Sequence, residues 1–142
     1  MRILVAIDGS AHSLRALRAA IRLLKRVSDA ERHLTLLSVH DPRSLQLAAG
    51  LVGSKGIKQY LAQASDEDLA QAKGLAERSG LTYDTLSRTG PIADTIGKTA
   101  TEGKYDILVV GAKGRGNLKD LLLGSVAHRI TSLTKVPVLM IR

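Results

Sequence analysis

The sequence predicts an α/β fold in which helices cover both faces of a parallel β-sheet. Short apolar runs of strand length alternate with longer stretches of helical periodicity along the 142 residues, and this alternation is typical of a parallel sheet. The predicted order of elements is βαβαβαβαβ, with right-handed crossovers between strands. The length is that of one domain, so we expect a single domain over residues 1–142.

The first three elements have clear patterns. Residues 3–7 are continuously apolar, as in a strand that is buried on both faces. Residues 10–27 should form an amphipathic helix, capped by Ser10 or Ser13, because apolar and basic side chains alternate at three- and four-residue steps. The apolar positions are Leu14, Leu17, Ile21 and Leu24, and the basic ones are Arg15, Arg18, Arg22, Lys25 and Arg26. Residues 34–39 read as the second strand.

The middle of the chain is less regular. Residues 41–56 hold three glycines among leucines and show no clear period, and connections of this length are usually either functional or mobile. The sequence alone assigns this segment no role. Residues 57–79 return to helical periodicity, and Gly80 is a suitable residue to end that helix. Residues 82–88 form a weaker strand.

The last third contains the strongest strand signal. Pro91 is expected in the first turn of a helix that ends near Glu102. Residues 105–110 follow as a strand that runs into a glycine-rich loop. A short helix over residues 125–135 and a strand over residues 136–141 complete the pattern.

Composition limits the classes of partner. The net charge is +8, which favours contact with anions such as nucleotides, and aromatic residues are only 2% of the chain. Single-stranded nucleic acid is bound on aromatic rings, so we regard nucleic acid as an unlikely partner, although duplex binding through phosphates alone stays open. There are no cysteines, and no run approaches the ~18 apolar residues of a membrane span. We expect a cytoplasmic protein.

The loop after the fourth strand carries the chemistry. It runs from Gly111 to Ser125 with the spacing Gly-x2-Gly-x9-Gly-Ser. Glycines let backbone N–H groups approach phosphate oxygens closely, and Gly124 and Ser125 fall where a helix N-terminus would add further N–H donors. Asp8 ends the first strand. If that strand neighbours the fourth, Asp8 and Gly111 line one crevice. The alternative for Asp8 is a turn or helix-capping carboxylate.

At these positions the sequence resembles the universal stress protein family. The resemblance covers essentially the whole chain and is carried by residues 3–10, by residues 106–111, by the full Gly-x2-Gly-x9-Gly-Ser loop and by residues 136–139. It implies a Rossmann-like, adenine-nucleotide-binding α/β fold, with five strands in the order 3-2-1-4-5. The intact glycine loop resembles that of the branch of the family that binds ATP.

The resemblance also implies a set of nucleotide-binding residues. Asp8 is placed near the ribose, Ala6 and Val39 along the adenine, and the remaining residues around the ribose and phosphates. The complete set is Ala6, Asp8, Val39, Val110, Gly111, Gly114, Gly124, Ser125 and Val126. Magnesium would be held mainly by the phosphates, no catalytic residue is assigned, and the metal ligands are unknown.

The last strand is the expected site of homodimerisation. Members of the resembled family often pair through it. Independently, Pro137 cannot donate a hydrogen bond to a neighbouring strand, so residues 136–141 are expected at an edge of the sheet. Pairing with a second copy would cover that edge.

The favoured hypothesis is an ATP-binding sensor or regulator of the stress response with at most weak ATPase activity, because no general base is evident. A first alternative is a dimeric, partner-binding protein that does not use ATP, or that binds AMP or another small anion. A second is a nucleic-acid-binding protein, and a third is an enzyme of the wider adenine-nucleotide-binding group. The regulatory partner is unknown.

Overall fold

A computed structural model describes residues 1–28, 31–43, 53–114 and 124–142. Their strands are β1 (Arg2–Ala6), β2 (His33–His40), β3 (Thr82–Thr89), β4 (Ile107–Gly111) and β5 (Val138–Ile141). All pairs are parallel and the order is β3-β2-β1-β4-β5. Both the α/β class and the strand order are therefore confirmed.

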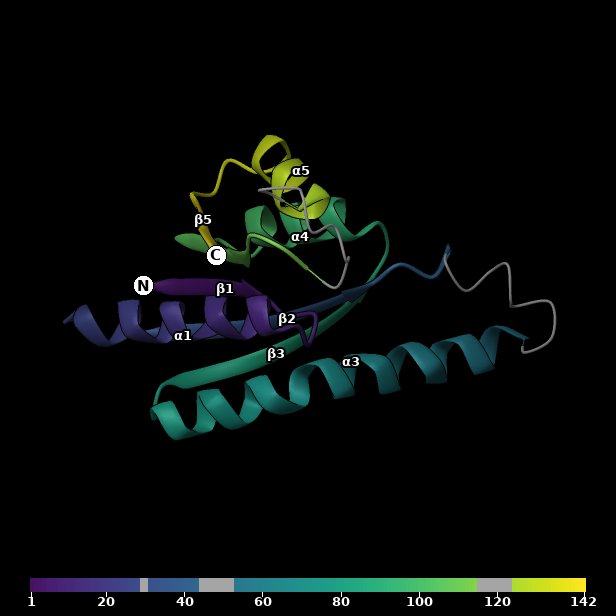
Figure 1. Ribbon diagram of the computed structural model, residues 1–142, viewed down its shortest axis with the longest axis horizontal. Coiled ribbons are helices and arrows are strands. Elements are labelled where there is room, and N and C mark those ends of the chain that lie inside the picture. Colours follow the sequence, from purple (N-terminus) through teal and green to yellow (C-terminus); the bar gives the residue numbers. More distant parts are fainter. Residues whose placement is uncertain (29–30, 44–52, 115–123) are drawn as a thin grey trace.

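Helices cover the two faces of the sheet (Figure 1). They are α1 (Ala11–Arg26), α3 (Gly53–Ser79), α4 (Ile92–Glu102) and α5 (Ser125–Leu133). Helices α1 and α3 pack with Ile3, Val5 and Leu36 in one apolar core. Helices α4 and α5 pack with Leu4 and Leu108 in a second core on the opposite face. Both faces are covered because side chains of successive strand residues point to opposite sides of the sheet.

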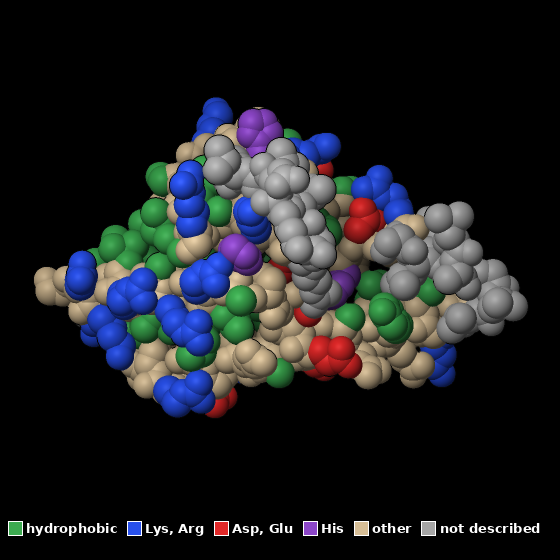
Figure 2. All heavy atoms as spheres, viewed as in Figure 1, with side chains coloured by type: hydrophobic (Ala, Val, Ile, Leu, Met, Phe, Trp, Pro, Cys, Tyr) green, Lys and Arg blue, Asp and Glu red, His purple; other side chains and the backbone are tan. Residues whose placement is uncertain are grey.

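Helix α1 forms as its sequence pattern predicts. Ser10 is the cap, since its side chain accepts a hydrogen bond from the Ser13 backbone N–H at 3.1 Å. The apolar positions Leu14, Leu17 and Leu24 are buried in the core. The basic positions remain on the outer face, where Lys and Arg side chains gather (Figure 2).

Several boundaries differ from the sequence prediction, among them those of α3, α5 and β5. Helix α3 already begins at Gly53, so residues 53–56 are helical rather than irregular. These first turns extend beyond the carboxyl ends of the strands (Figure 1), where no apolar period is needed because there is no sheet to cover. Helix α5 ends at Leu133 because Thr134 is extended, and β5 begins only at Val138. Residues 44–52 of the irregular segment lie outside the described part of the chain.

Pro91 is also placed slightly differently from the prediction. It caps α4 rather than occupying its first turn, and its carbonyl accepts a hydrogen bond from the Thr95 backbone N–H at 2.9 Å. Pro137 precedes β5 by one residue, and its carbonyl accepts from the Leu108 N–H at 2.9 Å. The last strand is an edge strand, as its proline indicates.

Candidate functional site

A cavity of about 530 Å³ opens at the carboxyl edge of the sheet. It lies at the ends of β1 and β4, which are neighbours in the sheet. The chain continues from β1 to β2 toward one edge of the sheet and from β4 to β5 toward the other edge, so the strand order reverses at this point. The structure brings all nine sequence-predicted residues to its wall. They are Ala6, Asp8, Val39, Val110, Gly111, Gly114, Gly124, Ser125 and Val126.

One end of the cavity is formed by the end of β4 and the start of α5. The Gly124 backbone N–H donates to the Ala112 carbonyl at 2.7 Å, and this bond holds the N-terminus of α5 beside Gly111. Gly124 caps α5 without a side chain, so a bound anion can take the place of a capping group at the positive end of the helix. Lys113 adds a positive charge to the same wall. Residues 115–123 of the predicted loop, including Arg115, lie outside the described residues.

Asp8 takes part in the turn before α1 and also lines the cavity. Its Oδ1 accepts a hydrogen bond from the Ser10 backbone N–H at 3.0 Å, which orders the turn into α1. Its other carboxylate oxygen faces Gly114: a Cβ added at Gly114 would lie only 2.9 Å from Asp8 Oδ2. Asp8 therefore stabilises the turn before α1, and its carboxylate also lies on the wall of the cavity.

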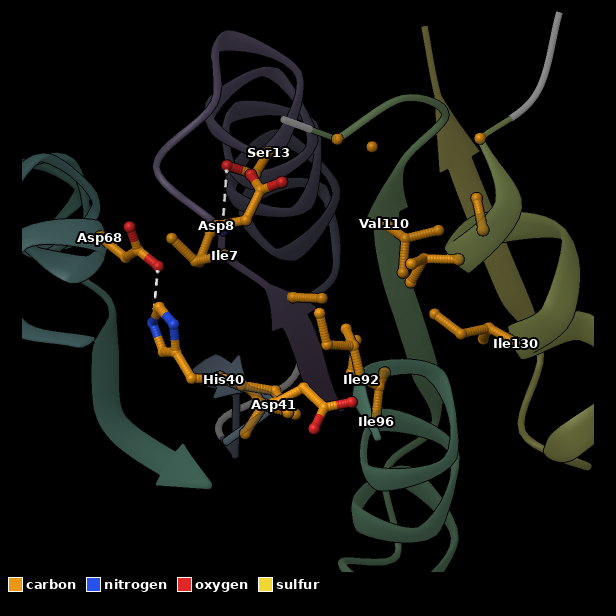
Figure 3. Close-up of a pocket in the computed structure, with 18 of the residues that line it drawn as sticks. Ile7, Asp8, Ser13, His40, Asp41, Asp68, Ile92, Ile96, Val110 and Ile130 are labelled. Atoms are coloured by element: carbon orange, nitrogen blue, oxygen red, sulfur yellow. Dashed lines mark hydrogen bonds and ion pairs between the residues drawn. The ribbon is translucent and has the colours of Figure 1, made fainter. Parts of the chain in front are cut away.

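Another part of the cavity wall is apolar. Side chains from β4, α4 and α5 converge on it: Val110, Ile92, Ile96 and Ile130 (Figure 3). Val39 and Ala6 lie at the adjoining strand ends and are partly buried. An apolar wall next to a few polar groups is the usual composition of a small-molecule site.

Helix α3 supplies a wall that sequence reasoning missed. Tyr60, Leu61, Ala64 and Asp68 line the cavity from this helix, together with His40 from the end of β2. His40 Nε2 lies 3.0 Å from Asp68 Oδ2 (Figure 3). The histidines of the sequence show no metal-ligand spacing, and no motif singles out His40. The signal in the sequence that could have identified the pair is Asp68, because helical periodicity places this carboxylate on the same buried face of α3 as Leu61 and Ala72.

A third carboxylate, Asp41, also lines the cavity. The Arg43 side chain donates to both of its oxygens, with Nη2 at 2.7 Å from Oδ2 and Nε at 3.1 Å from each. These hydrogen bonds lower the pKa of Asp41 from its usual value. Asp41 is therefore ionised at neutral pH, with its charge balanced by Arg43.

No group of three or more potential metal-ligating side chains occurs within residues 1–28, 31–43, 53–114 and 124–142. The Asp8 carboxylate and the Ser125 hydroxyl on the cavity wall are oxygen ligands of the type that Mg²⁺ prefers. Among the described helices, none is both long and apolar enough to span a bilayer.

Comparisons with known proteins agree with this architecture. Universal stress protein YxiE of Bacillus subtilis is 31% identical over 149 residues, covering 99% of this chain and 98% of that protein. The solved structure of the hypothetical protein MJ0577 of Methanocaldococcus jannaschii superposes with a TM-score of 0.85 at 26% identity, covering 99% of this chain and 94% of that one. A universal stress protein solved in complex with cAMP has a TM-score of 0.58 at 28% identity, covering 100% and 96%.

The match to a family extends over the whole chain. The sequence pattern of the Universal stress protein family fits residues 1–142. The parallel sheet in the order β3-β2-β1-β4-β5 is the Rossmann-like fold of the solved relatives. By sequence and by fold, this chain belongs to the universal stress protein family.

Proposed function

We propose that this protein binds ATP in the cavity and acts as a nucleotide-dependent regulator of the stress response in the cytoplasm. The observation that carries the proposal is the cavity itself, which joins an apolar wall to a glycine-lined helix N-terminus. These two ends match the base and the phosphates of a nucleotide. The relative that was solved with cAMP supports an adenine nucleotide as the ligand. The intact Gly-x2-Gly-x9-Gly-Ser loop resembles that of the branch of the family that binds ATP, and this resemblance supports a triphosphate.

In this arrangement the ligand runs along the carboxyl edge of the sheet. The phosphates lie against Gly111, Gly114 and the first turn of α5, with N–H groups as donors. The ribose lies near Asp8, and the adenine lies along Ala6 and Val39. Mg²⁺ neutralises the phosphates and is held mainly by them.

Hydrolysis of the bound ATP is expected to be slow. Phosphoryl transfer to water needs a group that positions the attacking water as well as charge neutralisation. The three carboxylates on the described wall each have another contact: Asp8 with Ser10, Asp41 with Arg43, and Asp68 with His40. A regulator that reports on bound ATP fits this arrangement better than an enzyme that consumes it.

The Asp8→Asn variant tests where the ribose lies. The amide oxygen can still accept from the Ser10 N–H, so the turn and the melting temperature should be kept. A charge-assisted hydrogen bond to a ribose hydroxyl is lost, which should weaken ATP binding about tenfold. Isothermal titration with ATP and with 2′,3′-dideoxy-ATP measures this effect.

The dideoxy analogue serves as the control. Wild-type protein should prefer ATP over the analogue, whereas Asp8→Asn should bind the two almost equally. If the variant loses the same factor for both ligands, Asp8 acts through its charge on another part of the nucleotide, and the ribose placement is wrong.

A homodimer through β5 belongs to the same proposal. The strand pairs with β4 on one side, and Leu139 and Met140 are each 38% exposed. An edge strand with exposed apolar side chains tends to pair with another strand. Antiparallel pairing with a second copy would join two five-stranded sheets into one.

Leu139→Arg should therefore give a monomer, because the two-fold axis would bring two like charges together across the new strand pair. Multi-angle light scattering at micromolar concentration measures the mass. Thr131→Arg adds the same charge on the exposed surface of α5 and should leave the dimer intact. A wild-type mass of 15.1 kDa would contradict the dimer.

A second candidate ligand is an adenosine monophosphate, which the cAMP complex of a relative favours. Direct competition between ATP and AMP for the cavity would decide between them.

A further inference from the structure

The cavity has a wall that none of the predicted nucleotide contacts uses. All nine predicted residues come from β1, β2, β4, α5 and the turns beside them, whereas Tyr60, Leu61, Ala64 and Asp68 come from α3. In Figure 3 Asp68 and His40 lie on one side of the cavity, and Val110 and Ile130 lie on the other. Asp8 is between them. Val39, which we place along the adenine, is next to His40 in β2, so the α3 wall adjoins the nucleoside half of the proposed ligand.

A close contact between a histidine and a buried carboxylate joins this wall to the sheet. Asp68 is only 4% exposed, His40 is 16% exposed, and His40 Nε2 lies 3.0 Å from Asp68 Oδ2. The rest of the buried face of α3 is mainly apolar, with Leu61, Leu69 and Ala72. Taking a carboxylate out of water costs several kcal/mol, and apolar residues of similar volume usually stabilise a fold as well as a buried ion pair does. Stability alone therefore gives a weak reason for this pair.

The position of His40 connects the pair to the base. His40 and Val39 are the last two residues of β2, and adjacent strand residues point to opposite faces of the sheet. His40 points toward α3, while Val39 packs with the core beneath α4 and α5 and lines the cavity. A contact that fixes His40 therefore also fixes the strand end that carries Val39.

A second polar contact joins the same two elements but does not reach the cavity. The Ser38 hydroxyl donates to the Ser65 hydroxyl at 3.4 Å, and both side chains are buried. Ser65 lies almost one turn before Asp68 on α3, and Ser38 lies two residues before His40 on β2. Neither serine lines the cavity. The chain thus offers an internal control for any effect of loosening α3 from β2.

We propose that Asp68 is a positioning residue that acts through His40 to hold α3 and the end of β2 around the nucleoside half of the bound nucleotide. Ligand affinity and the docking of α3 are then coupled, so that nucleotide binding tightens the contact of this helix with the sheet. The inference deepens the proposed function and rests on it for the identity of the ligand. Such coupling would give a regulator a structural response to the nucleotide: the first turns of α3 would pack more tightly against the sheet when the ligand is bound.

The test compares Asp68→Asn with Ser65→Ala in the full chain. Asp68→Asn should weaken binding of ATP with Mg²⁺ about tenfold, and binding of adenosine by a similar factor. Binding of inorganic tripolyphosphate, which carries the phosphate half alone, should stay within twofold of wild type. Ser65→Ala should leave all three affinities within twofold. Isothermal titration and competition give these values.

A double-mutant cycle tests that Asp68 acts through His40. His40→Asn should weaken ATP binding by a similar factor, and the double variant should bind no more weakly than either single variant. Equal losses for ATP and tripolyphosphate would indicate general destabilisation and overturn the proposal. Losses that multiply in the double variant, or an Asp68→Asn affinity equal to wild type, would also overturn it.

Hydrogen exchange separates this inference from the proposed function. In ligand-free protein, residues 57–68 should exchange faster in Asp68→Asn than in Ser65→Ala, and saturating ATP should slow exchange there in wild type. If wild type binds no ATP, the proposed function fails and the coupling to ATP fails with it, while the ligand-free comparison still decides whether the pair holds α3. Equal exchange in the two variants would overturn the positioning role.

Discussion

Gly114→Val should abolish detectable ATP binding while leaving the fold intact. A Cβ at position 114 would lie 2.9 Å from Asp8 Oδ2, within the space between Asp8 and the start of α5. The two methyl groups of valine would fill the region where we place the ribose and phosphates. Gly114 is itself exposed, so its replacement displaces no core side chain. We expect a loss of at least about 100-fold, or about 2.7 kcal/mol.

Thermal unfolding with and without ATP and Mg²⁺ measures this loss. In wild type, ATP at 100 times its dissociation constant should stabilise the fold by about 2.7 kcal/mol. In Gly114→Val the ligand-free melting temperature should stay close to wild type, and the stabilisation by the same ATP concentration should fall to about 0.4 kcal/mol or less. Any slow ATP turnover should fall as well. Wild-type affinity in the variant, or rapid turnover that survives the substitution, would place the nucleotide elsewhere.

Gly111→Ala should instead destabilise the protein. The added Cβ would lie 2.9 Å from the carbonyl carbon of His12 and 3.0 Å from its Cβ. These atoms belong to the first turn of α1, and a glycine at the end of β4 is what allows the helix to approach so closely. Overpacking against backbone costs about 1–3 kcal/mol, which for a chain of this size lowers the melting temperature by several degrees.

Gly74→Ala is the matched control for that result. Its added Cβ would meet the end of the flexible Arg78 side chain at 3.3 Å, in the interior of α3. The side chain can move, and alanine is favoured over glycine in a helix by about 0.5–1 kcal/mol. Thermal unfolding should rank the proteins as Gly74→Ala, wild type and Gly111→Ala in falling stability. Equal stability of wild type and Gly111→Ala would show that the end of β4 and α1 adjust freely.

The fold could be predicted largely from sequence because its signals are local. Continuous apolar runs and helical periods identify strands and helices, and Ser10 marks the start of α1 as its cap. The boundaries that differ are those where tertiary contacts end. Helix α3 begins at Gly53, before its apolar period starts, because its first turns project past the sheet. Strand β5 is shorter than its apolar run because the sheet pairing starts at Val138.

The glycine-lined half of the candidate site was also predictable. Asp8, Gly111 and Ser125 follow directly on predicted strands or open a predicted helix, and the strand order brings them to one edge of the sheet. The α3 wall was not predictable in the same way. Which turn of α3 meets the end of β2 depends on the path of the intervening chain, and neither His40 nor Asp68 belongs to a recognisable motif.

The central claim is that this cavity holds ATP, and the nucleotide that leaves freshly purified protein on denaturation tests it most directly. Mass spectrometry of the released material should find ATP at close to one molecule per chain, or ATP should fill the protein to that level when it is added with Mg²⁺. A protein that is purified empty and takes up no ATP on titration would contradict the account.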